Sequence, residues 1–150
     1  MIYRHTQPGT LMRIVLGGFI FFGAYSAASV SLGTQTAYWI VTGLIIVALA
    51  MFHSLTVEVD PRYIHWYFGP GWYKWRREIN DLESARISRS KWYNGWGIRI
   101  TPTGWLYNVS GFQCLDITDK YGKSFRIGTN DPEGLLKALQ RAGVKCDPDR

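Results

Sequence analysis

The residues of this chain best suited to catalysis or metal binding are three histidines and two cysteines. His5 lies near the N-terminus, and His53 and His65 follow far along the chain, without partners at metal-ligand spacing. His53 is interpreted as an interfacial residue at a helix end. Cys114 and Cys146 have no such spacing either, so free reduced thiols are expected. The sequence therefore predicts no metal and no cofactor.

The acidic and glycine-rich segments also provide no evidence of a catalytic site. Asp81 and Glu83 are close enough to interact, but their expected turn is exposed, which favours a solvated turn over an acid–base pair. The Gly95-Trp96-Gly97 segment is not followed by Lys and Ser or Thr and does not precede a helix, so it is not a phosphate-binding loop. The sequence predicts no catalytic residues and a protein that is not an enzyme.

The basic residues are more informative, because the chain carries a net charge of +6. A basic surface is predicted on strands expected to be neighbours, and it consists of Lys74, Arg76, Arg86, Arg89, Lys91 and Arg99. It could face anionic lipid headgroups, where each cation contributes on the order of 1 kcal/mol. It could equally be an ordinary charged face balanced by nearby carboxylates. Nucleic-acid recognition motifs are absent, so no nucleic-acid partner is expected.

The segment 91–111 is unusually rich in tryptophan, tyrosine and glycine. Trp92, Tyr93 and Trp96 surround Asn94-Gly95, a dipeptide that favours a tight turn. We predict that these three rings are exposed and contact a partner or the membrane; the alternative is that they fill the core. Trp105 and Tyr107 follow the next turn and are predicted to lie inside.

The N-terminal third of the chain contains a long stretch without charged residues. Between Arg13 and Glu58 there is no Asp, Glu, Lys or Arg. Apolar runs at 14–32 and 37–53, with a polar link at 33–36, would reach roughly 28 and 26 Å as helices. The sequence predicts a two-helix transmembrane hairpin at 14–53. The alternatives are a buried hairpin in a globular core and a cleaved signal peptide, since the segment 24–29 offers small residues after an apolar run.

The distribution of basic residues predicts the orientation of this hairpin. Fifteen of the seventeen Lys and Arg residues follow the second run, which predicts a protein of the cytoplasmic (inner) membrane with both termini cytoplasmic, including a tail at 1–13. Gly23, Ala27 and Ser31 repeat every four residues, a stripe that lets another helix approach closely. The stripe could also simply reflect the small residues common in membrane helices.

From Ser54 onward the pattern has a period of two, which is typical of half-buried strands. Strands are expected at 55–59, 64–68, 72–79, 84–89, 97–101, 105–109, 112–118 and 124–128. Asp131 can cap a helix that starts at Pro132 and ends before Gly143, so a helix is predicted at 131–142. The sequence thus predicts an α+β, mainly β domain at 54–143, followed by a tail at 144–150.

Three segments carry a family resemblance: WYFGPG at 66–71, GWGIRITPTGWLYNVSG at 95–111 and FRIGTNDPEGLLKAL at 125–139. Together with the order of elements, they resemble small bacterial membrane proteins that join a two-helix hairpin to a pleckstrin-homology (PH) domain. The resemblance implies a seven-stranded antiparallel barrel capped by a C-terminal helix, membrane residence and no catalytic mechanism. The turn at 60–62 is too short for the basic loop of phosphoinositide-binding relatives.

The function expected from these features is that of a non-enzymatic, membrane-anchored adaptor or accessory subunit. Its β-domain would bind another membrane protein, or its own copies, at the cytoplasmic membrane face. The leading alternative is a membrane protein that binds anionic lipid headgroups, and an enzyme is the remote alternative.

Overall fold

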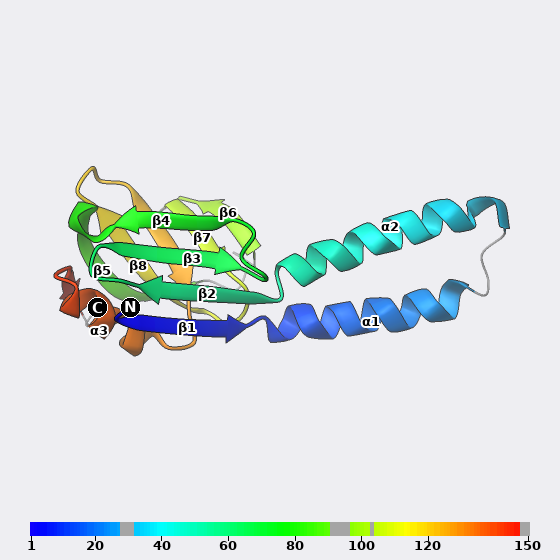
Figure 1. Ribbon diagram of the computed structural model, residues 1–150, viewed down its shortest axis with the longest axis horizontal. Helices are drawn as coiled ribbons and strands as arrows, with labels where there is room; N and C mark the ends of the chain where they lie inside the picture. Colours follow the sequence, from blue (N-terminus) through cyan, green and yellow to red (C-terminus); the bar gives the residue numbers. More distant parts are fainter. Residues whose placement is uncertain (28–31, 91–96, 103, 148–150) are drawn as a thin grey trace.

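The computed structural model describes residues 1–27, 32–90, 97–102 and 104–147. A β-rich domain carries a helical hairpin that projects from one end, and the N-terminus and α3 lie at the opposite end of that domain (Figure 1). In chain order the elements are β1 (Tyr3–Pro8), α1 (Thr10–Ala27), α2 (Leu32–Met51), β2 (Ser54–Val59), β3 (Tyr63–Phe68), β4 (Lys74–Glu78), the 3₁₀ turn η1 (Ile79–Asp81), β5 (Leu82–Arg89), β6 (Gly97–Thr101), β7 (Gly104–Asn108), β8 (Gln113–Asp119), β9 (Ser124–Gly128), α3 (Pro132–Arg141) and β10 (Lys145–Asp147).

The strands form two sheets. The first has the order β1-β2-β3-β4 with antiparallel neighbours, and the second has the order β10-β5-β8-β9-β7-β6. In the second sheet β10 pairs with β5, and β7 with β9, in parallel. The hydrophobic core lies between the sheets and α3, and the ring of Trp66 stacks on Phe125 with centroids 5.0 Å apart.

The predicted seven-stranded antiparallel barrel is wrong. The first sheet ends at β4 and the second at β6 and β10, and no ladder joins the sheets in the described part of the chain. The chain leaves the first sheet through η1, so β4 and β5 are consecutive strands of different sheets. The eight strands expected from the alternating pattern also omitted β1 and β10, which extend the sheets. The architecture is α+β, with two open sheets and α3 packed against strands of both.

The hairpin continues the β1–β2 ladder. All six residues of β1 pair with β2, and α1 and α2 then run side by side from the ends of these strands (Figure 1). The polar residues 33–36, predicted as the link between the helices, lie instead in the first turns of α2. The N-terminal segment, predicted as a tail, is therefore an integral strand of the first sheet.

The predicted transmembrane hairpin is also wrong. Within the described ranges, no helix combines the length and the hydropathy needed to cross a membrane. The apolar part of α1 starts only after Arg13, and the polar opening of α2 leaves 37–51 as its apolar part. At 1.5 Å per residue, 14–27 and 37–51 reach roughly 21 and 22 Å, against about 30 Å of hydrocarbon. The expected inner-membrane location, with both termini cytoplasmic, depended on this hairpin and is wrong as well.

The predicted C-terminal helix is present. Asp131 accepts a hydrogen bond from the Gly134 N–H at 3.0 Å, Pro132 occupies the first turn, and the helix ends at Arg141. Its apolar face is buried against the sheets through Leu135, Leu136, Ala138 and Leu139.

Candidate functional site

The free edge of the first sheet displays aromatic and basic side chains together. Trp72 and Tyr73, just before β4, are 76% and 65% exposed. On β4 itself Lys74, Arg76 and Arg77 are exposed. We call these five residues the β4 surface. Tryptophan, tyrosine and arginine are the residue types most enriched where binding energy concentrates in protein interfaces.

A glycine turn positions this edge. Gly69 and Gly71 have φ values of +50° and +79°, which residues with a side chain rarely adopt. The Gly71 N–H donates to the Phe68 carbonyl at 3.0 Å, which closes the turn between β3 and β4. The Ile79 N–H donates to the Arg62 carbonyl at 2.9 Å, which fixes the other end of the strand.

The same hydrogen bond determines which backbone groups of β4 point away from the sheet. In an antiparallel ladder, hydrogen-bonded pairs alternate with non-bonded pairs. Because Ile79 bonds to Arg62, the register of β3 and β4 makes Trp75 and Arg77 the residues bonded to β3. The backbone N–H and C=O groups of the alternate β4 residues therefore point outward, and these residues are Lys74, Arg76 and Glu78. No described strand pairs with this edge.

Two cations of the β4 surface, Lys74 and Arg76, lie against aromatic rings rather than carboxylates. The Lys74 ammonium lies 4.6 Å from the Tyr67 ring centroid, and the Arg76 guanidinium 5.7 Å from that of Tyr63. Over the described residues, none of the three cations of this surface forms an ion pair. Their positive charge is therefore available to an incoming group.

Two carboxylates lie at the far end of β4, where the β4 surface ends. A shallow depression of about 190 Å³ is lined by Tyr63, Arg76, Arg77, Glu78 and Asp81. Glu78 is exposed at the end of the strand. The positive potential is therefore strongest toward Lys74 and falls toward Glu78.

The other face of β4 is anchored in the core. The Trp75 ring contacts Tyr73 and Tyr107, with centroids 4.7 and 5.2 Å away, so the edge of the first sheet packs on β7 of the second. Burial raises the pKa of Tyr107, and the charge of Arg77 partly opposes that rise. This packing holds the strand rigid while Lys74 and Arg76 remain exposed.

The predicted basic surface is only partly gathered. Lys74 and Arg76 lie together on β4, but Arg86 and Arg89 lie on β5 and Arg99 on β6. β5 and β6 are separated by three strands of the second sheet, and β4 belongs to the other sheet, so these strands are not neighbours. Arg86 also contacts Asp116 at 3.5 Å. Lys91 lies outside the described residues.

The other predicted contact residues have different outcomes. Trp92, Tyr93 and Trp96 lie outside the described residues, so their exposure stays a prediction. Of the small-residue stripe, Gly23 is buried against α2 of its own hairpin, where it accepts a hydrogen bond from the Tyr38 hydroxyl at 3.0 Å. Ser31 lies outside the described residues, and Ala27 is the last residue of α1. The exposure of Trp72 and Tyr73 is not predicted by the sequence, which places both in a strand at 72–79. In the structure this strand begins only at Lys74.

The histidines are far apart and have structural partners. His5 Nε2 lies 2.6 Å from Asn130 Oδ1, His53 Nδ1 lies 2.5 Å from the Ala50 carbonyl, and His65 lies 3.9 Å from Asp60. The part of the chain described contains no group of three His, Cys, Asp or Glu side chains that could hold a metal ion.

The two cysteines are free thiols. Cys114 is fully buried and Cys146 is partly buried. Burial raises the pKa of both thiols. At neutral pH both therefore stay protonated and weakly nucleophilic.

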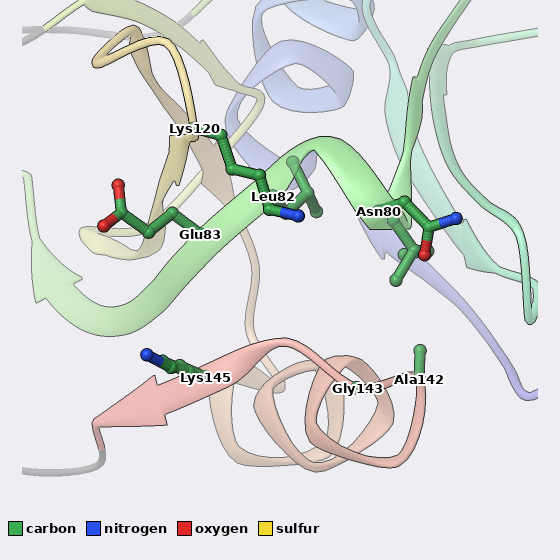
Figure 2. Close-up of a pocket in the computed structure, with 8 residues that line it drawn as sticks. Asn80, Leu82, Glu83, Lys120, Ala142, Gly143 and Lys145 are labelled. Atoms are coloured by element: carbon green, nitrogen blue, oxygen red, sulfur yellow. The ribbon is translucent and has the colours of Figure 1, made fainter.

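A pocket of about 480 Å³ lies between the start of β5 and the C-terminal end of α3. Figure 2 shows Lys145 and Glu83 reaching toward one side of it and Asn80 and Ala142 at the other. Its lining also includes Lys120. Its described lining residues include no histidine, cysteine or serine, and no ion pair links the charged groups among them. We assign this pocket no chemistry.

Comparison with known proteins adds no relative: no family model, no curated protein and no solved structure matches the chain. The resemblance to bacterial PH domains therefore stays a prediction.

Proposed function

We propose that the protein is a non-enzymatic adaptor that associates with its own copies through the helical hairpin and presents its β-domain to a protein partner. The observation that carries the proposal is the large apolar surface that α1 and α2 leave exposed.

Small and polar residues lie where the two helices of the hairpin meet, and many of its large apolar residues face outward. Gly23 and Thr42 are buried between the helices, and the Tyr38 hydroxyl bonds to Ser26 there. Facing outward, Phe21, Tyr25 and Leu44 are 78%, 75% and 66% exposed. Further exposed large apolar side chains on the hairpin are Ile14, Val15, Phe19, Ile20, Phe22, Trp39, Ile40, Val41 and Val47.

This surface exceeds what an isolated chain normally leaves uncovered. Contiguous apolar patches on monomeric proteins rarely exceed roughly 300–600 Å², and one aromatic side chain alone can bury about 150–250 Å². Covering such side chains stabilises an assembly by about 25 cal/mol per Å². The hairpin therefore favours association with an equally apolar surface.

A second copy of the chain fits this surface best. Its hairpin has the same length and no charged side chain between Arg13 and Glu58, so parallel copies bury no unpaired charge. An apolar groove of about 470 Å³ runs between the helices, lined by Phe19, Phe22, Ala37, Val41 and Ile45 among others. It can accept projecting side chains from a neighbouring hairpin. The β-domains of such copies stand at the same end.

The test is the oligomeric state of the purified chain by sedimentation velocity. We expect the wild type to form a discrete oligomer that a mild detergent dissociates by covering the same surface. Changing Phe21→Glu and Leu44→Glu together should yield monomers, because charge would have to be buried at the contact. The matched control Arg89→Glu, on the exposed face of β5, should leave the oligomer intact.

Three results would contradict the proposal. One is a wild type that stays monomeric without detergent. Another is a hairpin variant that associates as well as the wild type. The third is quantitative recovery of the chain with neutral lipid vesicles in place of oligomer formation, which would give the apolar surface a different occupant.

A further inference from the structure

We propose that the free edge of β4 binds an extended acidic segment of a partner protein, which adds to the first sheet as a fifth strand. This inference rests on the proposed adaptor function and names the class of partner and the place where it binds.

The backbone of β4 is ready for such an addition. Lys74, Arg76 and Glu78 direct their N–H and C=O groups outward, and no described strand occupies this edge. A strand laid along it can form the same ladder that β3 forms on the other side. Strand addition of this kind derives affinity from main-chain hydrogen bonds and specificity from alternate side chains.

The side chains of β4 select negative charge. Lys74 and Arg76 are two residues apart, so their side chains project from the same face of the sheet. Each lies against a tyrosine ring and has no carboxylate partner in the described part of the chain. Residues opposite each other on paired strands lie about 5 Å apart. The added strand therefore needs Asp or Glu at two positions separated by one residue.

The aromatic residues before β4 supply the apolar part of the contact. Trp72 and Tyr73 are exposed directly beside the Lys74 end of the strand. At the other end Glu78 and Asp81 repel carboxylates. The acidic pair of the partner therefore lies opposite Lys74 and Arg76, and its uncharged flank passes Glu78.

Proline at position 78 separates strand addition from simple charge attraction. Glu78 has φ −73° and ψ 137°, values that proline adopts without strain, and its N–H points away from β3. Glu78→Pro therefore removes one outward donor from the edge and leaves the sheet intact. It also removes a negative charge. Charge attraction alone predicts tighter binding of an acidic peptide by this variant, whereas strand addition predicts weaker binding.

The experiment measures fluorescence anisotropy of a labelled, end-capped nine-residue peptide, in which one Glu-Thr-Glu segment is flanked by Thr residues, bound to the full chain. We expect saturable binding, and slower amide hydrogen exchange at Lys74, Arg76 and Glu78. A peptide with Lys in place of Glu should not bind, nor should one with N-methylated Glu residues, which keeps the charge but lacks the N–H groups that the ladder requires.

The variants give the decisive comparison. Lys74→Glu with Arg76→Glu should weaken binding at least tenfold, and Arg89→Glu on β5 less than twofold. Glu78→Pro should weaken binding severalfold relative to Glu78→Gln, with matching melting temperatures. Equal binding by the two Glu78 variants overturns the inference. So does failure of the acidic peptide to bind, including the case in which only anionic vesicles bind this surface.

The two proposals fail separately. A chain that forms oligomers through its hairpin but does not bind the acidic peptide retains the proposed adaptor role and loses the β4 site. A monomeric chain that binds the peptide loses the self-association and keeps the site.

Discussion

The Gly9 N–H donates a hydrogen bond to the His53 carbonyl at 2.7 Å, at the point where the β1–β2 ladder passes into the helical hairpin. A Cβ atom on Gly9 would lie 2.9 Å from that carbonyl oxygen and 3.1 Å from the Phe52 oxygen. The backbones of the two strands therefore approach as closely as a glycine allows. This contact ties the start of α1 to the end of α2.

Gly9→Ala should destabilise the protein by about 1–3 kcal/mol, because the added methyl group forces two backbone segments apart. Gly17→Ala in α1 is the matched control, since a Cβ there meets nothing within 4 Å. Alanine at that helical position should stabilise by up to about 1 kcal/mol. Urea denaturation of both variants measures the difference. Equal stabilities would show that the junction tolerates a side chain.

A cross-strand triad in the second sheet gives another prediction. Asp116 on β8 stands opposite Arg86 on β5 and Arg126 on β9. Arg126 Nε lies 2.6 Å from Asp116 Oδ1, and both side chains are largely buried, whereas Arg86 is 63% exposed at 3.5 Å. Asp116→Ala leaves the Arg126 charge buried without a partner and should cost about 3–5 kcal/mol.

Arg86→Ala should cost less than about 1 kcal/mol, because its pair with Asp116 is exposed to solvent. The free energies of unfolding of the two variants are compared in the same urea series. The assignment of the buried pair to Arg126 would be wrong if Arg86→Ala destabilised the protein as much as Asp116→Ala.

The Tyr3 hydroxyl should make the protein sensitive to alkali. It donates a hydrogen bond to Asp131 Oδ2 at 3.0 Å, and the same carboxylate caps α3. Burial, then the bond to Asp131 and its charge, raise the pKa of Tyr3 well above its usual value of 10.0. The unfolded chain therefore releases this proton at lower pH than the folded chain. Stability is intact below pH 10 and falls as the pH rises above it.

Tyr3→Phe should cost about 1 kcal/mol at pH 8 through the lost hydrogen bond. It should also flatten the decline in stability between pH 9 and about 11, since phenylalanine has no proton to lose. Urea midpoints across this range, for both proteins, provide the measurement. An unchanged pH slope in the variant would assign the alkaline sensitivity to another group.

Trp92 and Trp96 are predicted from the sequence to form a contact surface. Their joint replacement by alanine should leave the melting temperature nearly unchanged, because exposed substitutions usually cost within about 0.5 kcal/mol. It should weaken association, since tryptophan truncation at an interface often costs about 2 kcal/mol or more. A collapse of the melting temperature would instead assign both rings to the core, where each truncation costs about 3–5 kcal/mol.

Most of the local elements can be predicted from the amino-acid sequence. Alternating polar and apolar residues identified β2, β3 and β5 to within a few residues, because period two is a property of the strand alone. Asp131 and Pro132 located the start of α3 for the same reason, since a helix cap involves only residues a few positions apart. The charge-free stretch likewise identified two helices.

How these elements combine into sheets is seen only in the three-dimensional structure. β1 was missed because Tyr3–Pro8 becomes a strand through pairing with β2, more than forty residues away. The predicted basic surface assumed that consecutive strands are neighbours, yet β4 and β5, joined by η1, belong to different sheets. The residues of that surface therefore lie apart, and the structure has two open sheets where a barrel was expected. The free edge of β4 could not be predicted either. A strand is recognised as an edge strand only when the order of all the strands in its sheet is known. Pairing between distant segments is set by the balance of packing over the entire core, and no local pattern of residues encodes it.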